Sequence, residues 1–355
     1  MSLAGIVIAA MPPAGNCTLP PSTQTTGPSF HGIALTLFLP GPYVKLTSRP
    51  RQGRTNLSRK IGSLRNVSSD PDARLRVAAI NFLNPAPLMW DFEHPPLDAP
   101  LALRYRIDRM LPSKCAARLN AGEADLGLVP IAALATSPGL RILPGCTIAS
   151  KGRVRSLLLV RRAAQPLAAL RSVAADTASR TTITYARILF HHWGNPEVPF
   201  LPMPADLDTM LERADAAIVI GDPALLALEE RANRFERTGE ELVYHDMAEE
   251  WLFHTGLPFV SAVWAAAPDS PVDERVAEDL IQSRNHGLEN IEALVAEWSP
   301  RFAMPEQTIR SYLTSNIHYV LDNECLEGMR GFFRMAAEAG ILPEYSFSLE
   351  EFAVR

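Results

Sequence analysis

The sequence predicts a two-lobed α/β protein with a helical C-terminal part. From Arg74 onward, short apolar strands alternate with helix-like segments, which is typical of sheets with parallel strands. Two long apolar strand candidates, 155–161 and 259–265, enclose a second α/β pattern of about a hundred residues. After Ala267 the pattern is helical almost to the end. Together these observations indicate one lobe, a crossing, a second lobe, and a return to the first.

The first seventy-odd residues differ from the rest. Residues 1–69 contain seven basic and no acidic residues, and they are rich in Pro, Ser, Thr and Gly without a periodic apolar pattern. We expect residues 1–73 to be a disordered or spurious extension. Residues 70–355 contain the other 27 of the 34 basic residues and all 39 acidic residues, so they carry a formal net charge of −12. This acidity argues against nucleic acid as a partner.

The chain is expected to be cytoplasmic and without a membrane anchor. No apolar run approaches the roughly 20 residues that span a bilayer. The apolar run at 3–11 is not preceded by a basic residue, which disfavours a secretory signal. The four cysteines lie far apart without metal-ligand spacing, which indicates a reducing compartment and no zinc site.

Four elements are expected in the first lobe. Residues 75–80 form a buried strand, and 81–85 form the turn after it. Residues 101–105 form a second strand, and 113–121 form a helix capped by Ser113 and ended by Gly122. A third strand, 125–129, is stopped by Pro130.

The second lobe and the C-terminal part follow the same logic. In the second lobe we expect a strand at 173–175, a helix over 183–193 and a strand over 216–220. In the C-terminal part we expect helices over 273–298 and 305–339, and the second of these is broken near Asn323 and ends at Gly340. Two lobes joined by two crossings form a hinged cleft. This is the architecture of type II periplasmic-binding-protein-like folds, with lobe 1 at 74–160 plus 262–355 and lobe 2 at 161–261.

The motif 176–182 is the best candidate for an anion site. It holds four hydroxyl side chains and Arg180 between a strand and a helix. The start of a helix presents unpaired N–H groups and a positive dipole end, which suit a carboxylate or phosphate. We therefore expect Ser179, Arg180, Thr181 and Thr182 to bind substrate. An ordinary helix cap is the alternative, and Arg180 could equally pair with Asp176 or Asp222.

Two further polar residues lie at predicted strand ends or crossings. Asn84 follows the first strand, and its uncharged amide suits orienting a carboxylate or polarising a leaving hydroxyl. Turn chemistry before Pro85 is the alternative. Ser156 precedes the first crossing strand, and its hydroxyl could face a ligand. The nearby Lys151, Arg153 and Arg155 are interpreted as solvated surface charges.

Gly221 and Asp222 end the second-lobe strand. Glycine permits close backbone approach to a ligand. Asp222 is either a base or the cap of the next helix, and the cap is favoured. His254 lies beside the return crossing and is the one histidine kept as a candidate base. His191 and His192 lack a third ligand at useful spacing, which argues against a metal site there. The nucleotide, dinucleotide and hydrolase motifs are absent from the sequence.

The residues from Arg76 to Leu88 resemble the N-terminal signature of the chorismate dehydratase family, which acts in the futalosine route to menaquinone. Further blocks similar to that family follow in order and cover roughly 75–340: 124–130, 150–156, 176–182, 214–222 and 249–264. The extension 1–73 has no counterpart in the family pattern. Pro85 and Ala86 depart from the small or polar residues expected after the Asn.

The resemblance implies a hydro-lyase that converts chorismate into 3-[(1-carboxyvinyl)oxy]benzoate and water without a cofactor or metal. It implies that Ser156 and the Ser179–Thr182 helix start hold the two carboxylates, and that Asn84 hydrogen-bonds the reacting hydroxyl or an enolate-like intermediate. The enolpyruvyl carboxylate of the substrate is then a candidate proton acceptor, with His254 as the fallback. A homodimer is compatible with the sequence, which does not determine the oligomeric state.

Two alternatives share this fold. The first is a solute-binding receptor, which would be exported. The second is the sister enzyme 1,4-dihydroxy-6-naphthoate synthase, which opens with a Cys-containing turn where this chain has 82–85.

Overall fold

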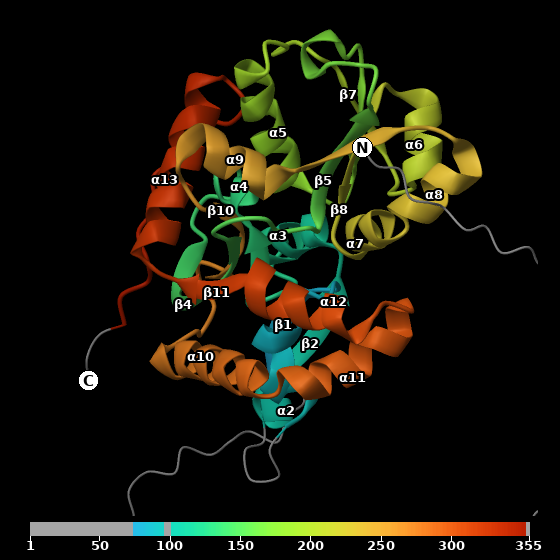
Figure 1. Ribbon diagram of the computed structural model, residues 1–355. Coiled ribbons are helices and arrows are strands. Elements are labelled where there is room, and N and C mark those ends of the chain that lie inside the picture. The colour runs from blue at the N-terminus through green and yellow to red at the C-terminus, as the bar shows by residue number, and fades with distance from the viewer. Residues whose placement is uncertain (1–73, 96–100, 353–355) are drawn as a thin grey trace, which may run out of the picture. The chain divides into compact units, whose positions relative to one another are not determined.

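Residues 74–95 and 101–352 are described by the structure, a computed structural model, and they build two β-sheets with helices around them (Figure 1). The extension expected over residues 1–73 lies outside the described residues. The part described confirms the predicted α/β class with two sheets. Each sheet is mixed, with a parallel part and antiparallel strands added to it.

The six-stranded sheet forms the first lobe, in the order β11-β4-β10-β3-β1-β2. Strand β1 pairs in parallel with β2 and β3, whereas β10 runs antiparallel between β3 and β4. The strands of this sheet are β1 (Leu75–Ile80), β2 (Tyr105–Met110), β3 (Leu126–Pro130), β4 (Arg141–Ser150), β10 (Phe259–Ala266) and β11 (His318–Leu321).

The five-stranded sheet forms the second lobe, in the order β7-β6-β8-β5-β9. Strands β6, β7 and β8 are parallel, and β5 runs antiparallel between β8 and β9. The strands are β5 (Leu157–Arg162), β6 (Val173–Asp176), β7 (Phe200–Met203), β8 (Ala216–Ile220) and β9 (Leu242–Asp246).

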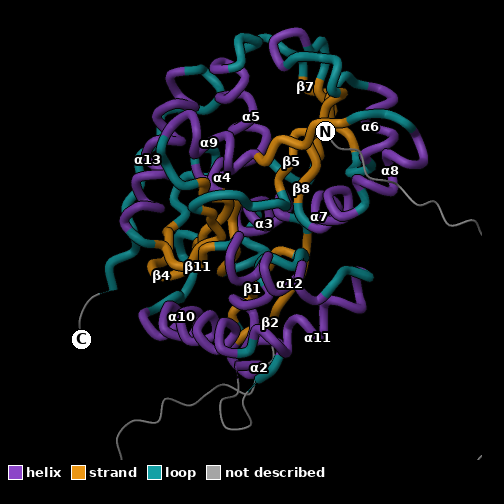
Figure 2. Tube along the Cα trace, in the orientation of Figure 1, coloured by secondary structure: helices purple, strands orange, loops and turns teal. Residues whose placement is uncertain are grey.

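Helices cover the faces of both sheets (Figure 2). In the first lobe α3 packs on β1 and β3, and α10 packs on β4; in the second, α6 packs on β6 and β8. The α-helices are α1 (Trp90–Glu93), α2 (Leu101–Arg104), α3 (Pro112–Asn120), α4 (Ile131–Leu134), α5 (Arg180–His192), α6 (Leu207–Arg213), α7 (Asp222–Glu229), α8 (Arg231–Thr238), α9 (Met247–Thr255), α10 (Glu274–Glu289), α11 (Ile291–Phe302), α12 (Glu306–Ser311) and α13 (Asn323–Glu338).

Two chain segments cross between the sheets. The first, 151–156, runs from β4 to β5, and the second, 247–258, runs from β9 through α9 to β10. The proposed lobe boundaries after residues 160 and 261 therefore fall inside β5 and β10, each of which belongs wholly to one sheet. The Asp246 carboxylate ties the crossings together, because it accepts hydrogen bonds from the backbone of Val154 and Arg155 and from that of Ala248 and Glu249.

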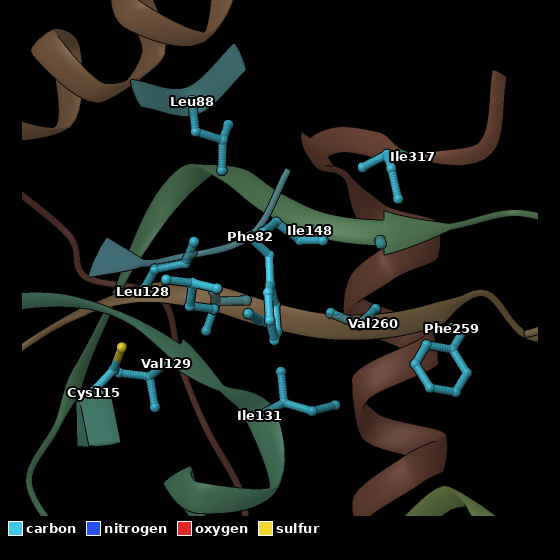
Figure 3. Close-up of a cluster of buried hydrophobic side chains, with 14 of the residues drawn as sticks. Phe82, Leu88, Cys115, Leu128, Val129, Ile131, Ile148, Phe259, Val260 and Ile317 are labelled. Atoms are coloured by element: carbon cyan, nitrogen blue, oxygen red, sulfur yellow. The ribbon is translucent and has the colours of Figure 1, made fainter. Parts of the chain in front are cut away.

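The apolar strands are buried on both faces, which explains their continuous hydrophobic runs. In β8, Ala216, Ile218 and Ile220 join a large core cluster that extends through both lobes. The alternate residues Ala217 and Val219 join a smaller cluster on the other face. Figure 3 shows part of the large cluster, with Phe82 among Ile131, Ile148 and Val260.

Several predicted elements are wrong in detail. Residues 101–104 form α2, and the strand begins only at Tyr105. Helix α3 begins at Pro112 with Leu111 at the cap position, so Ser113 is not the cap. The helix expected over 273–298 is two helices separated at Asn290. Between α12 and α13 the chain forms a π-helical turn, Tyr312–Asn316, and then β11, neither of which the apolar spacing predicts.

None of the described helices is both long and apolar enough to cross a membrane.

Candidate functional site

A cavity of about 40 Å³ lies between the ends of strands from both sheets. The polar side chains in its wall are Asn84 and Ser261 from the first lobe and Ser179, Thr181 and Thr182 from the second. The other lining residues are apolar or glycine: Ile80, Phe82, Pro112, Pro130, Ile148, Leu157, Ile220, Gly221 and Ala262. Of the described residues that line this cavity, none carries a formal charge. The wall is thus neutral, with hydroxyl and amide groups set into an apolar surface.

The second-lobe part of this wall is the start of α5. The Ser179 hydroxyl caps the helix by accepting a hydrogen bond from the Thr182 backbone N–H at 3.0 Å. Ser179, Thr181 and Thr182 are all buried. The predicted cap is therefore present, and the same residues face the cavity. The two interpretations of this motif are compatible, because a hydroxyl that accepts from the backbone still has its own hydrogen to donate.

Thr181 extends this arrangement across the cleft. Its Oγ1 accepts a hydrogen bond from the backbone N–H of Ala132, in the first lobe, at 3.1 Å. A second bond between the lobes runs from the Ser113 N–H to the Ala178 carbonyl at 3.2 Å. The start of α5 is thereby held against the first lobe, and Thr181 keeps a hydrogen that can be directed to a ligand.

Arg180 lies apart from the cavity wall. Its side chain is exposed, and neither Asp176 nor Asp222 pairs with it among the ion pairs of the described residues. The Asp176 carboxylate instead accepts from the Ala178 backbone N–H at 2.9 Å. Burial raises the pKa of Asp176, and its backbone hydrogen bonds oppose that rise.

Asn84 projects from the turn after β1 and lines the cavity. Within the described part of the chain its Oδ1 atom is buried without a hydrogen-bond partner. A buried acceptor without a partner is costly, typically about 1–3 kcal/mol. Turn chemistry alone does not explain this cost, because a turn Asn normally hydrogen-bonds its own backbone. A ligand donor such as a hydroxyl would satisfy the atom.

Ser156 lies behind the cavity wall. The residue is fully buried, it does not line the cavity itself, and its neighbour Leu157 does. Its carbonyl accepts from the Gly221 N–H at 2.7 Å, and its Oγ accepts from the Tyr312 hydroxyl at 2.8 Å. Sequence reasoning missed Tyr312, since nothing in the local pattern distinguishes it from other apolar residues of a helical segment.

Gly221 and Asp222 make contacts across the cleft. Gly221 has φ 65° and ψ −142°, and a Cβ at this position would lie 2.8 Å from the Phe82 ring. Glycine is thus required both by the backbone conformation and by close packing against Phe82. The contact joins the second-lobe strand end to the first lobe.

Asp222 is not the helix cap that was favoured from the sequence, because Gly221 takes the cap position of α7. Its Oδ1 accepts from the Leu83 backbone N–H at 2.9 Å, across the cleft. Burial raises the pKa of Asp222 to about 6, and the bond from Leu83 opposes the rise. Asp222 does not line the cavity, so the structure places it beside the site rather than in its wall.

His254 lies on α9, outside the cavity wall. Its ring stacks on that of His192 with 5.0 Å between centroids, and its Nε2 is 3.8 Å from a Glu250 oxygen. Burial and the neighbouring His254 charge lower the pKa of His192. The structure therefore gives His254 a partner on α5 and does not bring it to Asn84 or Ser179.

The basic residues of the first crossing each form an ion pair, and Lys151 and Arg153 are exposed, as interpreted from the sequence. Lys151 contacts Asp322 at 2.7 Å, Arg153 contacts Glu249 at 2.8 Å, and Arg155 contacts Glu229 at 2.5 Å. Arg155 also has a left-handed backbone with φ 65°, which is unusual for a residue with a side chain. These ion pairs hold the crossing to both lobes.

One group among the described residues has metal-ligand types close together. The ligand atoms of His318, Asp322 and Cys325 lie within 4.8 Å of one another. The Lys151 ammonium already contacts the Asp322 carboxylate, and Asp322 caps α13 through the Cys325 N–H. These contacts explain why the three side chains lie close together without a metal ion, and none of the three lines the cavity.

Two lobes on separate sheets, joined by two crossings and with a cavity between them, define the class of periplasmic-binding-protein-like folds. Solved structures agree with this class. An Archaeoglobus fulgidus protein superposes with a TM-score of 0.60 at 15% identity, covering 76% of this chain and 99% of that one. The alkanesulfonate-binding protein of Xanthomonas axonopodis pv. citri gives a TM-score of 0.53 at 16% identity, covering 76% and 94%. At these identities the likeness shows the fold.

The sequence comparisons identify the family. The profile of a family described as menaquinone biosynthesis matches residues 75–338, and the chain belongs to that family. A chorismate dehydratase from Thermus thermophilus is 27% identical over 248 residues, which are 67% of this chain and 88% of that enzyme. The resemblance noted in the sequence is thereby confirmed.

Proposed function

We propose that this protein is a hydro-lyase that removes water from chorismate to give 3-[(1-carboxyvinyl)oxy]benzoate. The observation that carries the proposal is the similarity to the T. thermophilus chorismate dehydratase, which extends over 88% of that enzyme. The neutral, hydroxyl-lined cavity supports it, because the substrate is a small dicarboxylic ring acid that needs hydrogen-bond donors.

The hydroxyl groups around the cavity are suited to hold carboxylates. Ser156, Ser179 and Thr181 each accept a hydrogen bond from the protein, so their own hydrogens are available to an anion. Hydrogen bonds to a charged acceptor are stronger than neutral ones. In this proposal Ser179, Thr181 and Thr182 hold one carboxylate and Ser156 contacts the other. Arg180, at the exposed edge, guides the anion in.

The chemical step is an elimination that makes the ring aromatic. A ring C–H bond breaks and its electron pair enters the ring, the neighbouring C–O bond breaks, and the hydroxyl leaves with a proton as water. In this proposal the amide of Asn84 hydrogen-bonds the reacting hydroxyl or an enolate-like intermediate. Orientation and stabilisation of developing charge are the main contributions required of the protein.

The proton acceptor in this proposal is the enolpyruvyl carboxylate of the substrate. Of the described residues, no carboxylate or histidine side chain lines the cavity, and His254 stacks on His192 outside it. Asp222 follows the end of β8 beside the cavity, but its Oδ1 accepts from the Leu83 backbone N–H. A base carried by the substrate therefore fits the wall better than either residue.

Substrate entry requires the lobes to separate. The cavity of about 40 Å³ is far below the roughly 300–1,000 Å³ of ordinary ligand sites. The contacts that hold it closed run between lobes: Leu83 to Asp222, Ala132 to Thr181, and Phe82 to Gly221. Ser156 lies on the crossing itself, so opening extends the cavity toward it.

The test is incubation of the purified protein with chorismate, followed by absorbance and mass spectrometry for an aromatic enolpyruvyl ether. We expect the substrate mass to fall by that of one water molecule as aromatic absorbance appears. Tight binding of another solute without turnover of chorismate would contradict the proposal and favour a solute-binding receptor.

A further inference from the structure

Tyr312 is a buried tyrosine that connects the C-terminal helices to the first crossing. It begins a π-helical turn, Tyr312–Asn316, which is a rare local structure found often at functional sites. The same turn contacts the crossing twice. Tyr312 reaches Ser156, and the Asn316 side chain donates to the Arg153 carbonyl at 2.9 Å.

The hydrogen bonds at Tyr312 have a defined direction. Its hydroxyl donates to Ser156 Oγ at 2.8 Å. Burial raises the pKa of Tyr312, so the hydroxyl keeps its hydrogen and can donate it.

This direction determines where the Ser156 hydrogen points. Once Ser156 Oγ accepts from Tyr312, the serine hydrogen must find a different acceptor. Within residues 74–95 and 101–352 the hydrogen bonds of the structure supply none. The hydrogen is therefore available to a carboxylate oxygen that reaches Ser156.

We propose that Tyr312 is a positioning residue for the dehydration, which orients the Ser156 hydroxyl through the hydrogen bond that its phenol donates to Ser156 Oγ. This inference rests on the proposed function. With the tyrosine hydroxyl removed, the Ser156 hydrogen rotates freely among directions. The Ser156 hydroxyl then meets the substrate in the right geometry less often.

The experiment measures kcat and KM for chorismate with Tyr312→Phe. We expect kcat/KM to fall about tenfold, the scale of one lost neutral hydrogen bond. Tyr319→Phe is the matched control, because the Tyr319 hydroxyl is also buried but has no partner among the described residues. Tyr319→Phe is expected to retain the wild-type rate.

A double-mutant cycle separates positioning from a general structural effect. In a Ser156→Ala background, Tyr312→Phe is expected to lower kcat/KM by less than twofold, because the group it orients is gone. A full tenfold loss in that background, or a Tyr312→Phe rate equal to wild type, overturns the inference. If the Phe variant does not fold, 3-fluorotyrosine at 312 must change kcat/KM, and at 319 it must not.

Calorimetric binding of chorismate distinguishes failure of this inference from failure of the proposed function. Binding without turnover in the wild type contradicts the proposed dehydratase activity. The double-mutant cycle of Tyr312→Phe and Ser156→Ala is then measured with the dissociation constant of chorismate in place of kcat/KM. Weaker binding by Tyr312→Phe only when Ser156 is present supports the inference, and unchanged binding overturns it. A wild type that neither binds nor converts chorismate overturns both.

Discussion

At the scale of single residues, the cavity wall combines groups whose hydrogen-bonding capacity the protein has only half used. Ser179 and Thr181 accept from backbone N–H groups and retain a hydrogen to donate. Asn84 retains an unpartnered acceptor among the described residues. In the proposed function these groups bind an uncharged hydroxyl and a carboxylate together, since they offer both an acceptor and donors.

Asn84→Ala is expected to lower kcat about 100-fold, because one preorganised hydrogen-bonding group at a developing charge contributes about that much. Steady-state turnover of chorismate measures it. Asn81→Ala is the control, since Asn81 lies in the same turn with an exposed side chain. Wild-type turnover by the Asn84 variant would remove this residue from the mechanism.

Asp222 makes the stability of the fold depend on pH. Burial raises its pKa from 3.8 to about 6, so the folded state holds this proton more tightly than the unfolded chain does. The stabilising contribution is therefore complete below about pH 3.8 and is lost as the pH rises through about 6. Two pKa units correspond to a loss of about 3 kcal/mol.

Asp222→Asn keeps an oxygen acceptor for Leu83 and removes the titration. We expect this variant to gain stability relative to wild type as the pH rises from 4 to 7, as measured by urea unfolding at each pH. Asp269→Asn, at an exposed position, is the control. A constant difference between wild type and Asp222→Asn across this range would disprove the titration.

At the scale of elements, the start of α5 serves both the fold and the site. The cap at Ser179 satisfies a backbone N–H that the helix leaves unpaired, and it fixes the hydroxyl in the cavity wall. The motif was recognisable in the sequence because strand, hydroxyl-rich turn and helix follow one another directly. Its partner across the cleft, Ala132, was not recognisable, because a backbone N–H leaves no mark in a sequence.

Ser179→Ala is expected to reduce the free energy of unfolding by about 1 kcal/mol and to raise KM for chorismate severalfold. Asp206→Ala is the matched control, since Asp206 caps α6 in the same lobe through the Thr209 N–H and does not line the cavity. Denaturant unfolding and kinetics distinguish the two variants. An equal KM for both would show that Ser179 acts only as a cap.

At the scale of the whole described unit, residues 74–95 and 101–352, the proposed function depends on the approach of two sheets. The crossings are fixed at Asp246, which binds backbone groups of both. Phe82 packs on Gly221 where the strand ends meet. Closure is therefore built from close packing and a few hydrogen bonds, which are interactions that a ligand of modest affinity can reorganise.

Gly221→Ala tests closure. The new Cβ collides with the Phe82 ring, and the φ of 65° is unfavourable for alanine. We expect weaker substrate binding and a larger radius of gyration by X-ray scattering. Gly194→Ala is the control, because Gly194 has φ 74° and nothing within 4 Å of an added Cβ. If both variants show the same radius of gyration, the collision with Phe82 does not open the lobes and the change is due to backbone strain alone.

The sequence by itself determined the α/β class, the strands β1, β8 and β10, the hydroxyl motif at α5 and the family resemblance. These features are local, since apolar period, cap chemistry and residue order are properties of neighbouring positions. Elements with weak local signals were missed or misassigned, including α2, β4, β11 and the π-helical turn, because tertiary contacts override propensity there.

Only the tertiary structure decided which candidates meet. It brought Asn84, Ser179, Thr181, Thr182 and Gly221 to one cavity, placed Ser156 behind it, and left Arg180, Asp222 and His254 out of the wall. It also placed Tyr312, 156 residues away in sequence, against Ser156. Such contacts depend on how two sheets pack. Residues so far apart in the chain produce no periodic pattern from which their contact could be predicted in a single sequence.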